Sequence, residues 1–112
     1  MEEKLYDTSV LIDLWSSNIR RLEAYTTIFN IIEFPKALLI KNLVVLYPTR
    51  EDFNAAILIA KDLLKIGKPV GAIDIVIASI ALRKNLAIVT SDSDFKYIKK
   101  VRPDLKIELK QL

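Results

Sequence analysis

Acidic residues stand beside apolar stretches at four separated places in this sequence of 112 residues. They are found in LYD, NIIEF, GAIDIVIASIAL and IVTSDSD, at positions Asp7, Glu33, Asp74, Asp92 and Asp94. Carboxylates that are crowded together repel one another unless a cation offsets their charge. Mg²⁺ and Mn²⁺ favour carboxylate and water ligands, and Mg²⁺ commonly keeps positions open for phosphate oxygens. If these side chains meet, they indicate phosphodiester hydrolysis in which a bound metal activates water.

Asp74 has the least ordinary surroundings of the five acids. It is the only charged residue between Gly71 and Arg83, and Ile73 and Ile75 flank it. A lone carboxylate in a segment of this kind is costly to bury without a partner. A metal ligand would explain it, and so would a simple cap on a helix that begins at Ile75. The residues themselves leave both readings open.

The other acids also have plain structural explanations. Glu33 fits a solvated acid near the end of a helix, and Asp92 and Asp94 fit turn residues ahead of FKYIKK. Asp13 and Asp62 lie on the polar faces of predicted helices, where we expect solvation rather than catalysis. Glu33, Asp92 and Asp94 would form a functional site only if the folded chain brought them together with Asp7 and Asp74.

Short strands alternate with helices along the chain. We predict strands at 5–7, 23–26, 43–48, 86–90 and 105–109, and helices that start near Val10, Thr27, Thr49, Asp74 and Ser93. The helix from Thr49 to about Lys65 has a predicted apolar stripe of Ala56, Ile59, Ala60, Leu63 and Leu64. This order is typical of a single α/β domain with a mainly parallel central sheet flanked by helices.

A parallel sheet also explains how the acids could meet. Ligands of such sheets gather at the carboxyl ends of the strands. Asp7 ends the first predicted strand, and Asp92 follows the strand at 86–90. Glu33 and Asp74 belong to helices, from which each could bring a carboxylate to the same edge.

Composition narrows the chemistry further. The sequence contains no cysteine and no histidine, which excludes disulfides, thiolate nucleophiles, histidine catalysis and the usual zinc sites. The net charge of +3, with a pI near 9.2, is compatible with an anionic partner such as nucleic acid. The start MEEKLYD is acidic where a signal peptide would be basic, and no apolar run reaches membrane-spanning length. We therefore expect a cytoplasmic protein with no membrane partner.

Taken in order, these motifs resemble a known family. YDTSVLIDL, the glutamate of TTIFNIIEF, the aspartate of GKPVGAIDIVIASIAL, and IVTSDSDF are similar to the motifs of PIN-domain ribonucleases, in particular the VapC-type toxins of prokaryotic toxin–antitoxin pairs. The resemblance covers most of the chain and implies that residues 1–112 form one PIN-like nuclease domain. The implied activity is hydrolysis of RNA by an endoribonuclease that depends on Mg²⁺ or Mn²⁺.

The resemblance also implies roles for individual residues. Asp7, Glu33, Asp74 and Asp92 become the catalytic acids, and the expected metal ligands are Asp7, Asp74, Asp92 and Asp94. Whether Asp92 or Asp94 contacts the metal is left open by the sequence. Thr8 or Ser9 would orient Asp7 or a bound water.

The implied partners are an RNA substrate, a cognate antitoxin that covers the site, and a second copy of the chain. Basic residues that could hold RNA phosphates, or simply belong to a mixed surface, are Arg20, Arg21, Lys36, Lys41, Arg83, Lys84, Lys96, Lys99 and Lys100. No aromatic-rich RNA-reading motif is present.

Other protein classes fit less well. A phosphatase of the haloacid-dehalogenase type would carry Asp-x-Asp after its first strand, where this chain has Asp7, Thr8 and Ser9. A receiver domain would need an acidic pair near the first strand and a lysine near a late strand, and neither feature is evident in this sequence. A non-catalytic PIN-like module for scaffolding or RNA binding is the remaining alternative, and metal binding would separate it from an enzyme.

Overall fold

The computed structural model describes residues 2–111. Its elements, in chain order, are β1 (Lys4–Tyr6), α1 (Thr8–Ser16), β2 (Arg21–Thr27), α2 (Ile28–Glu33), the 3-10 helix η1 (Pro35–Leu39), β3 (Lys41–Leu46), α3 (Arg50–Lys65), α4 (Ala72–Lys84), β4 (Ala87–Thr90), α5 (Phe95–Val101) and β5 (Lys106–Leu109). Each predicted strand and helix is present, although the helix expected near Val10 already begins at Thr8. None of the helices in this described part is both long and apolar enough to cross a membrane.

The strands form one sheet in the order β3-β2-β1-β4-β5, and every neighbouring pair is parallel. The predicted α/β domain with a parallel sheet is therefore confirmed. The chain first moves outward from β1 to β2 and β3, and then returns to build β4 and β5 on the other side of β1. The strand order thus reverses between β1 and β4, and ligands of open parallel sheets bind at the carboxyl ends of strands at such a reversal.

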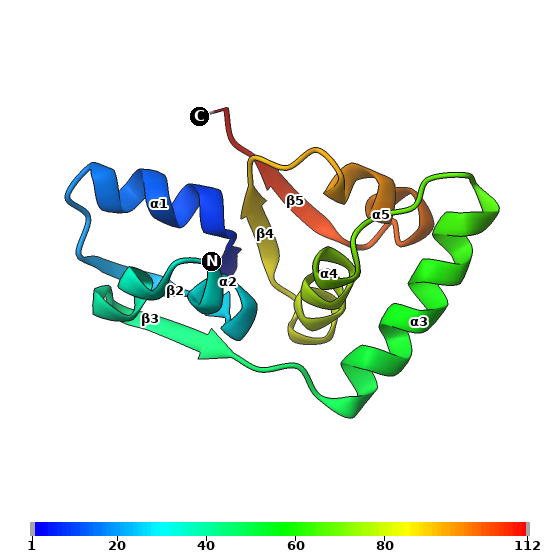
Figure 1. Cartoon of the computed structure of the whole chain (residues 1–112), viewed down its shortest axis with the longest axis horizontal. Helices are drawn as coiled ribbons and strands as arrows, with labels where there is room; N and C mark the ends of the chain where they lie inside the picture. Colours follow the sequence, from blue (N-terminus) through cyan, green and yellow to red (C-terminus); the bar gives the residue numbers. More distant parts are fainter. Residues whose placement is uncertain (1, 112) are drawn as a thin grey trace.

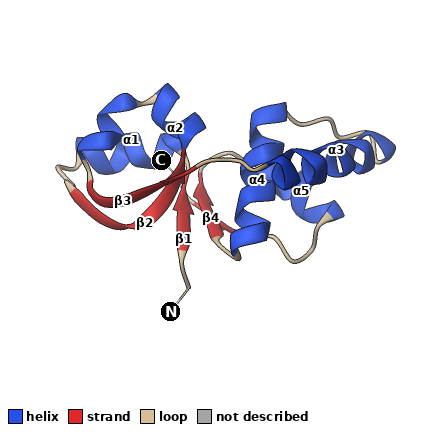
Figure 2. Cartoon of the chain, turned by 90° about the horizontal axis from the view of Figure 1, so that it is seen from below, coloured by secondary structure: helices blue, strands red, loops and turns tan. Residues whose placement is uncertain are grey.

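Helices cover both faces of the sheet. Figure 2 shows α1 and α2 on one side and α3, α4 and α5 on the other. Successive residues of a strand point to opposite faces, so in β1 the side chain of Leu5 packs with α3, α4 and α5, and that of Tyr6 packs with the cluster under α1 and α2. The sheet is therefore a layer between two separate apolar cores.

The helices are placed by their caps and apolar faces. Thr27 and Thr49 both form the predicted N-caps, each in a reciprocal capping box with the residue three positions later. In α4, every residue from Ile75 to Ala81 is buried because the helix lies between the sheet and α3, as Figure 1 shows. A helix that is apolar all round is expected in such a position.

One part of the predicted apolar stripe on α3 is wrong. Ala56, Ile59 and Leu63 are buried, but Leu64 is 66% exposed. Each helical residue turns about 100° from the previous one, so Leu64 points away from the face that carries Leu63. The contact between α3 and α4 therefore depends on a narrower stripe than the sequence indicated.

Candidate metal centre

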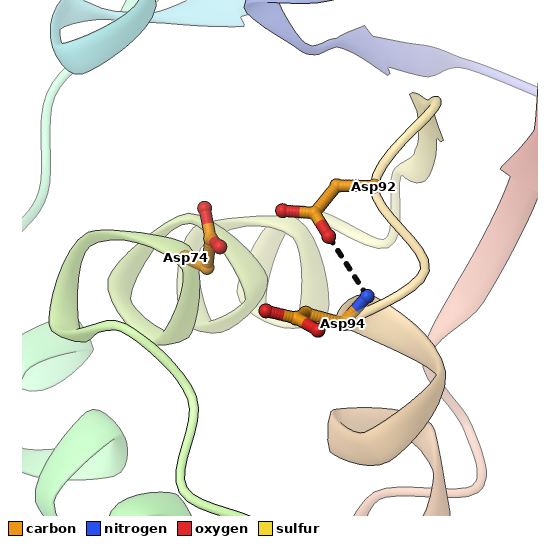
Figure 3. Close-up of side chains that lie close together, drawn as sticks. All are labelled: Asp74, Asp92 and Asp94. Atoms are coloured by element: carbon orange, nitrogen blue, oxygen red, sulfur yellow. Dashed lines mark hydrogen bonds between the residues drawn. The ribbon is translucent and has the colours of Figure 1, made fainter.

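Three carboxylates converge where the strand order reverses. Asp74 comes from the first turn of α4, and Asp92 and Asp94 come from the connection between β4 and α5. One oxygen from each side chain lies within 4.8 Å of the others. Figure 3 shows the three side chains pointing toward one another from these two segments. This spacing would allow one cation to contact all three.

Asp74 does not cap its helix. Helix α4 begins at Ala72, its N-cap position is Gly71, and no side chain makes the cap hydrogen bond. The alternative in which Asp74 caps a helix beginning at Ile75 is therefore wrong. The physical reason is that the helix starts three residues earlier, which puts Asp74 inside the first turn with its carboxylate directed at Asp92 and Asp94.

The electrostatics of the cluster favour a cation. Burial, the largest cause, and the negative charges of Asp92, Asp7 and Asp94 together raise the pKa of Asp74 to about 7. Both causes disfavour a second and third negative charge in the same small volume. A divalent cation bound there would remove this repulsion and would let Asp74 ionise at neutral pH.

Asp7 is held rigidly beside this group. Its Oδ1 accepts a hydrogen bond of 2.8 Å from Asn30 Nδ2, and its Oδ2 accepts one of 2.7 Å from Thr90 Oγ1. Thr90 Oγ1 also accepts the backbone N–H of Asp92 at 3.0 Å, so one hydroxyl ties Asp7 to the following acid. Asp7 lies outside the group of three, yet its charge contributes to the raised pKa of Asp74.

Asn30 is a site residue that the sequence reasoning missed. It is completely buried, and its Oδ1 accepts the backbone N–H of Thr27 at 3.2 Å and the hydroxyl of Thr27 at 2.6 Å. Its Nδ2 donates to Asp7 and, at 2.9 Å, to Thr8 Oγ1. The TTIFN stretch does signal a capped helix, but only the folded chain shows that the same amide reaches Asp7.

Glu33 joins the same network at its rim. Thr8 Oγ1 donates a hydrogen bond of 2.9 Å to Glu33 Oε1, so Glu33 connects to Asp7 through Thr8 and Asn30. Glu33 is exposed at the end of α2 and does not belong to the group of three. Its predicted role as a catalytic acid remains a prediction, as does that of Asp7.

The two small polar residues after Asp7 have different partners. Thr8 lies between Asn30 and Glu33, whereas Ser9 Oγ is hydrogen-bonded to Ser91 Oγ at 2.6 Å. Ser91 directly precedes Asp92, so this bond attaches α1 to the connection that carries the acids. The Thr8 hydroxyl is therefore linked by hydrogen bonds to the Asp7 carboxylate through Asn30. Ser9 instead supports the connection between β4 and α5.

Turn chemistry explains only part of the SDSD segment. Asp92 Oδ1 accepts the backbone N–H of Asp94 at 2.9 Å, a bond typical of an aspartate in a turn. The turn reading accounts for that one oxygen, but it does not explain why Asp94 and Asp74 also direct carboxylates toward Asp92. Both aspartates of this segment thus offer an oxygen to the cluster.

A surface hollow of about 580 Å³ is bounded by residues of β1, β2 and β3, among them Lys4, Tyr25 and Val44. It contains none of the five acids. The indication of chemistry therefore comes from the carboxylate cluster and not from this hollow.

The whole fold is similar to that of solved VapBC structures. VapBC2 from Rickettsia felis, bound to a DNA fragment from its promoter, aligns with a TM-score of 0.72 and 17% identity over 95% of this chain and 97% of that chain. DNA-bound VapBC from Salmonella typhimurium aligns with a TM-score of 0.72 and 22% identity over 96% and 98%. VapBC-1 from nontypeable Haemophilus influenzae aligns with a TM-score of 0.69 and 20% identity over 95% and 96%.

Sequence comparison adds nothing to this likeness, because no family model and no curated protein matches the chain. The structural agreement, by contrast, extends over nearly the full length of both partners in each alignment. The aligned part spans at least 95% of this chain, which has a five-stranded parallel sheet with helices on both of its faces. The chain therefore has the PIN-like fold that its motifs implied, as a single α/β domain of the kind found in VapBC structures.

Proposed function

We propose that this protein is an endoribonuclease of the VapC type that hydrolyses RNA phosphodiester bonds with Mg²⁺ or Mn²⁺. The observation that carries the proposal is the convergence of Asp74, Asp92 and Asp94 at the strand reversal of a PIN-like fold. Such a cluster is unfavourable without a cation and suits a hard divalent one. In this proposal Asp7, which directly follows β1 and is held next to the group, completes the acidic set.

The donor atoms fit the proposed ion. All of them are carboxylate oxygens, which Mg²⁺ and Mn²⁺ prefer over nitrogen and sulfur ligands. Asp74, Asp92 and Asp94 would hold the ion, with Asp7 as a further ligand. When bound, it would supply an activated water and stabilise negative charge on the phosphate oxygens.

The residues of the chain would prepare this chemistry by holding the acids in place. Asn30 and Thr90 each donate to one oxygen of Asp7, so its carboxylate has a single orientation. Thr8 holds Glu33 at the exposed rim, where substrate and solvent can reach it. Positioning of this kind lowers the cost of assembling reactants at the site.

We also propose that the protein belongs to a VapBC-type pair in the cytoplasm, with an antitoxin as its binding partner and a homodimer as its assembled form. The support is the full-length likeness to chains of three VapBC structures. Co-purification of the tagged protein with proteins of its own host would test the antitoxin, and light scattering of the purified protein would test the homodimer.

Metal binding can be tested without knowing the RNA. Thermal unfolding of the wild type is expected to shift upward with Mn²⁺, by about 2.7 kcal/mol of stability when the metal is a hundredfold above its dissociation constant. Asp74→Asn should lose this response because one ligand is lost. The control Asp13→Asn changes an exposed acid of α1 and should respond like the wild type.

A wild type that ignores both Mn²⁺ and Mg²⁺ would contradict the proposal and favour the non-catalytic PIN-like module. If the metal stabilises the wild type, RNA cleavage should appear with Mn²⁺ or Mg²⁺ and stop in EDTA. A response that persists in Asp74→Asn would remove Asp74 from the ligand set.

A further inference from the structure

Several of the basic residues that could have held RNA are occupied within the protein. Arg83 donates two hydrogen bonds, of 2.8 and 2.9 Å, to the buried carboxylate of Asp52. The Arg20 guanidinium lies 3.4 Å from the ring centroid of Trp15 and donates to its carbonyl. Lys99 donates to two backbone carbonyls in the turn after α5. These three side chains make contacts within the protein, so fewer basic residues remain as candidates for binding RNA phosphates.

Two other lysines converge on one aromatic ring. The Nζ of Lys68 lies 5.2 Å and the Nζ of Lys100 lies 5.6 Å from the ring centroid of Tyr97. Within residues 2–111, neither lysine forms an ion pair with a carboxylate, and both are exposed. Tyr97 is half-buried against the core, so its ring is a fixed support for both ammonium groups.

This lysine pair is connected to the acid cluster through two segments. Lys68 lies in the short connection from α3 to α4, the helix whose first turn carries Asp74. Tyr97 lies one turn after Asp94, and its backbone N–H donates to the Asp94 carbonyl at 3.0 Å. Residues three apart share a helix face, and Figure 1 shows the α3–α4 connection running beside α5.

The charges of the pair call for an anion. Both ammonium groups lie near the same ring, and neither has a carboxylate ion-pair partner within the described chain. Phosphate oxygens of a nucleic-acid backbone are suitable partners for such ammonium groups. A polymer with one phosphate at the acids also brings its neighbouring phosphates along the surface, so the two sites suit successive parts of one strand.

We propose that Lys68 and Lys100 bind backbone phosphates of single-stranded RNA beside the acid cluster, and that Tyr97 is the positioning residue that holds both ammonium groups. This inference rests on the proposed function and names the part of the surface that receives the substrate. Because the two lysines would contact the phosphate backbone and not the bases, they would add affinity for RNA without sequence preference.

The test measures RNA affinity against salt in a background that does not cut. Asp7→Asn protein with Mn²⁺ is titrated against a labelled single-stranded RNA of about 20 nucleotides and mixed sequence, a length that exceeds the usual site size. Adding Lys68→Gln and Lys100→Gln should reduce the slope of log K against log salt by about 1.4, and should weaken binding about 20-fold at 0.1 M salt. Lys68→Arg with Lys100→Arg should restore both values because it keeps the charges.

A matched control removes the same charge from the opposite edge of the sheet. Lys41 begins β3 and Lys84 ends α4, and both are exposed. Lys41→Gln with Lys84→Gln should keep the slope of the background protein. In otherwise wild-type protein, the change at Lys68 and Lys100 should raise KM for RNA cleavage and leave kcat nearly unchanged, which a merely structural defect would not do.

The outcomes separate this inference from the proposed function. An unchanged slope in the Lys68 and Lys100 variant, or an equal loss in the control pair, would overturn the inference while RNA cleavage by the wild type still stands. Absence of RNA binding in every protein, together with no metal-dependent cleavage by the wild type, would overturn both.

Discussion

Asp7 and Asp74 are acids at the same edge of the sheet, but they have opposite surroundings. Asp7 is buried, and a neutral donor satisfies each of its oxygens, Asn30 on one side and Thr90 on the other. Asp74 faces two further carboxylates, and burial together with the neighbouring negative charges raises its pKa to about 7. One acid is therefore positioned by hydrogen bonds, and the other lies among acids whose charges disfavour its ionisation.

The Asp7→Asn variant tests the role of the positioned acid. We expect RNA cleavage to disappear, because the charge near the proposed metal is lost. The fold should survive, since the amide oxygen can still accept one donor and the Thr90 hydroxyl can turn to accept the new N–H. Cleavage assays and thermal unfolding check the two parts separately, and an active Asp7→Asn protein would refute the assignment.

At the scale of elements, the contact between α3 and α4 places Asp74. Besides its apolar stripe, this contact includes the buried Asp52, whose carboxylate accepts Arg83 of α4 and the backbone N–H of Thr49. Burial would raise the pKa of Asp52, but the bonds from Arg83 and Thr49 outweigh it and lower the pKa below its usual value. Asp52 thus caps one helix and attaches it to the next.

Asp52→Ala should accordingly destabilise the protein by about 1–3 kcal/mol, because both the cap and the charged hydrogen bonds are lost. Chemical denaturation measures the change. Asp62→Ala is the matched control: this acid pairs with Arg102 but is 38% exposed, and its loss should cost at most about 1 kcal/mol. Equal losses of stability in the two variants would show that the buried pair of Asp52 and Arg83 stabilises the protein no more than the exposed pair does. Cleavage at saturating metal should persist in both variants.

At the scale of the whole molecule, the acids produce a distinctive dependence of stability on pH. The raised pKa of Asp74 means that, without metal, the folded state keeps a proton that the unfolded chain releases near its ordinary value of 3.8. This contribution is fully present below that value and is lost as the pH rises to about 7. The lowered pKa values of Asp52 and Glu108 act oppositely, but only as the pH falls below their ordinary values.

In EDTA, therefore, the melting temperature should fall between about pH 5 and pH 7.5, with a slope of at most about 1.4 kcal/mol of stability per pH unit from Asp74. Circular dichroism melts at a series of pH values measure it. Saturating Mn²⁺ should reverse the trend, since bound metal favours the ionised acids. Asp74→Asn should flatten the profile in EDTA, and an unchanged slope in that variant would assign the effect to another group.

Much of the fold follows from local pattern. The apolar runs ending at Tyr6 and Thr90 predict buried strands, and Thr27 and Thr49 predict helix starts, because side-chain hydrogen bonds within a few residues decide them. The exposed Leu64 was misplaced because an apolar residue beside a stripe looks the same in sequence as one within it. Which face of α3 meets α4 depends on packing between distant segments.

By itself, the sequence determined the alternation of strands and helices, the absence of sulfur and imidazole ligands, and the five acids worth following. Only the tertiary structure decided that Asp74 is not a cap, that Asn30 and Thr90 hold Asp7, and that Lys68 lies beside Tyr97. Periodicity and capping act over neighbouring residues and can be read along the chain. The site is made by side chains up to 83 positions apart, and their meeting depends on the order of strands in the sheet.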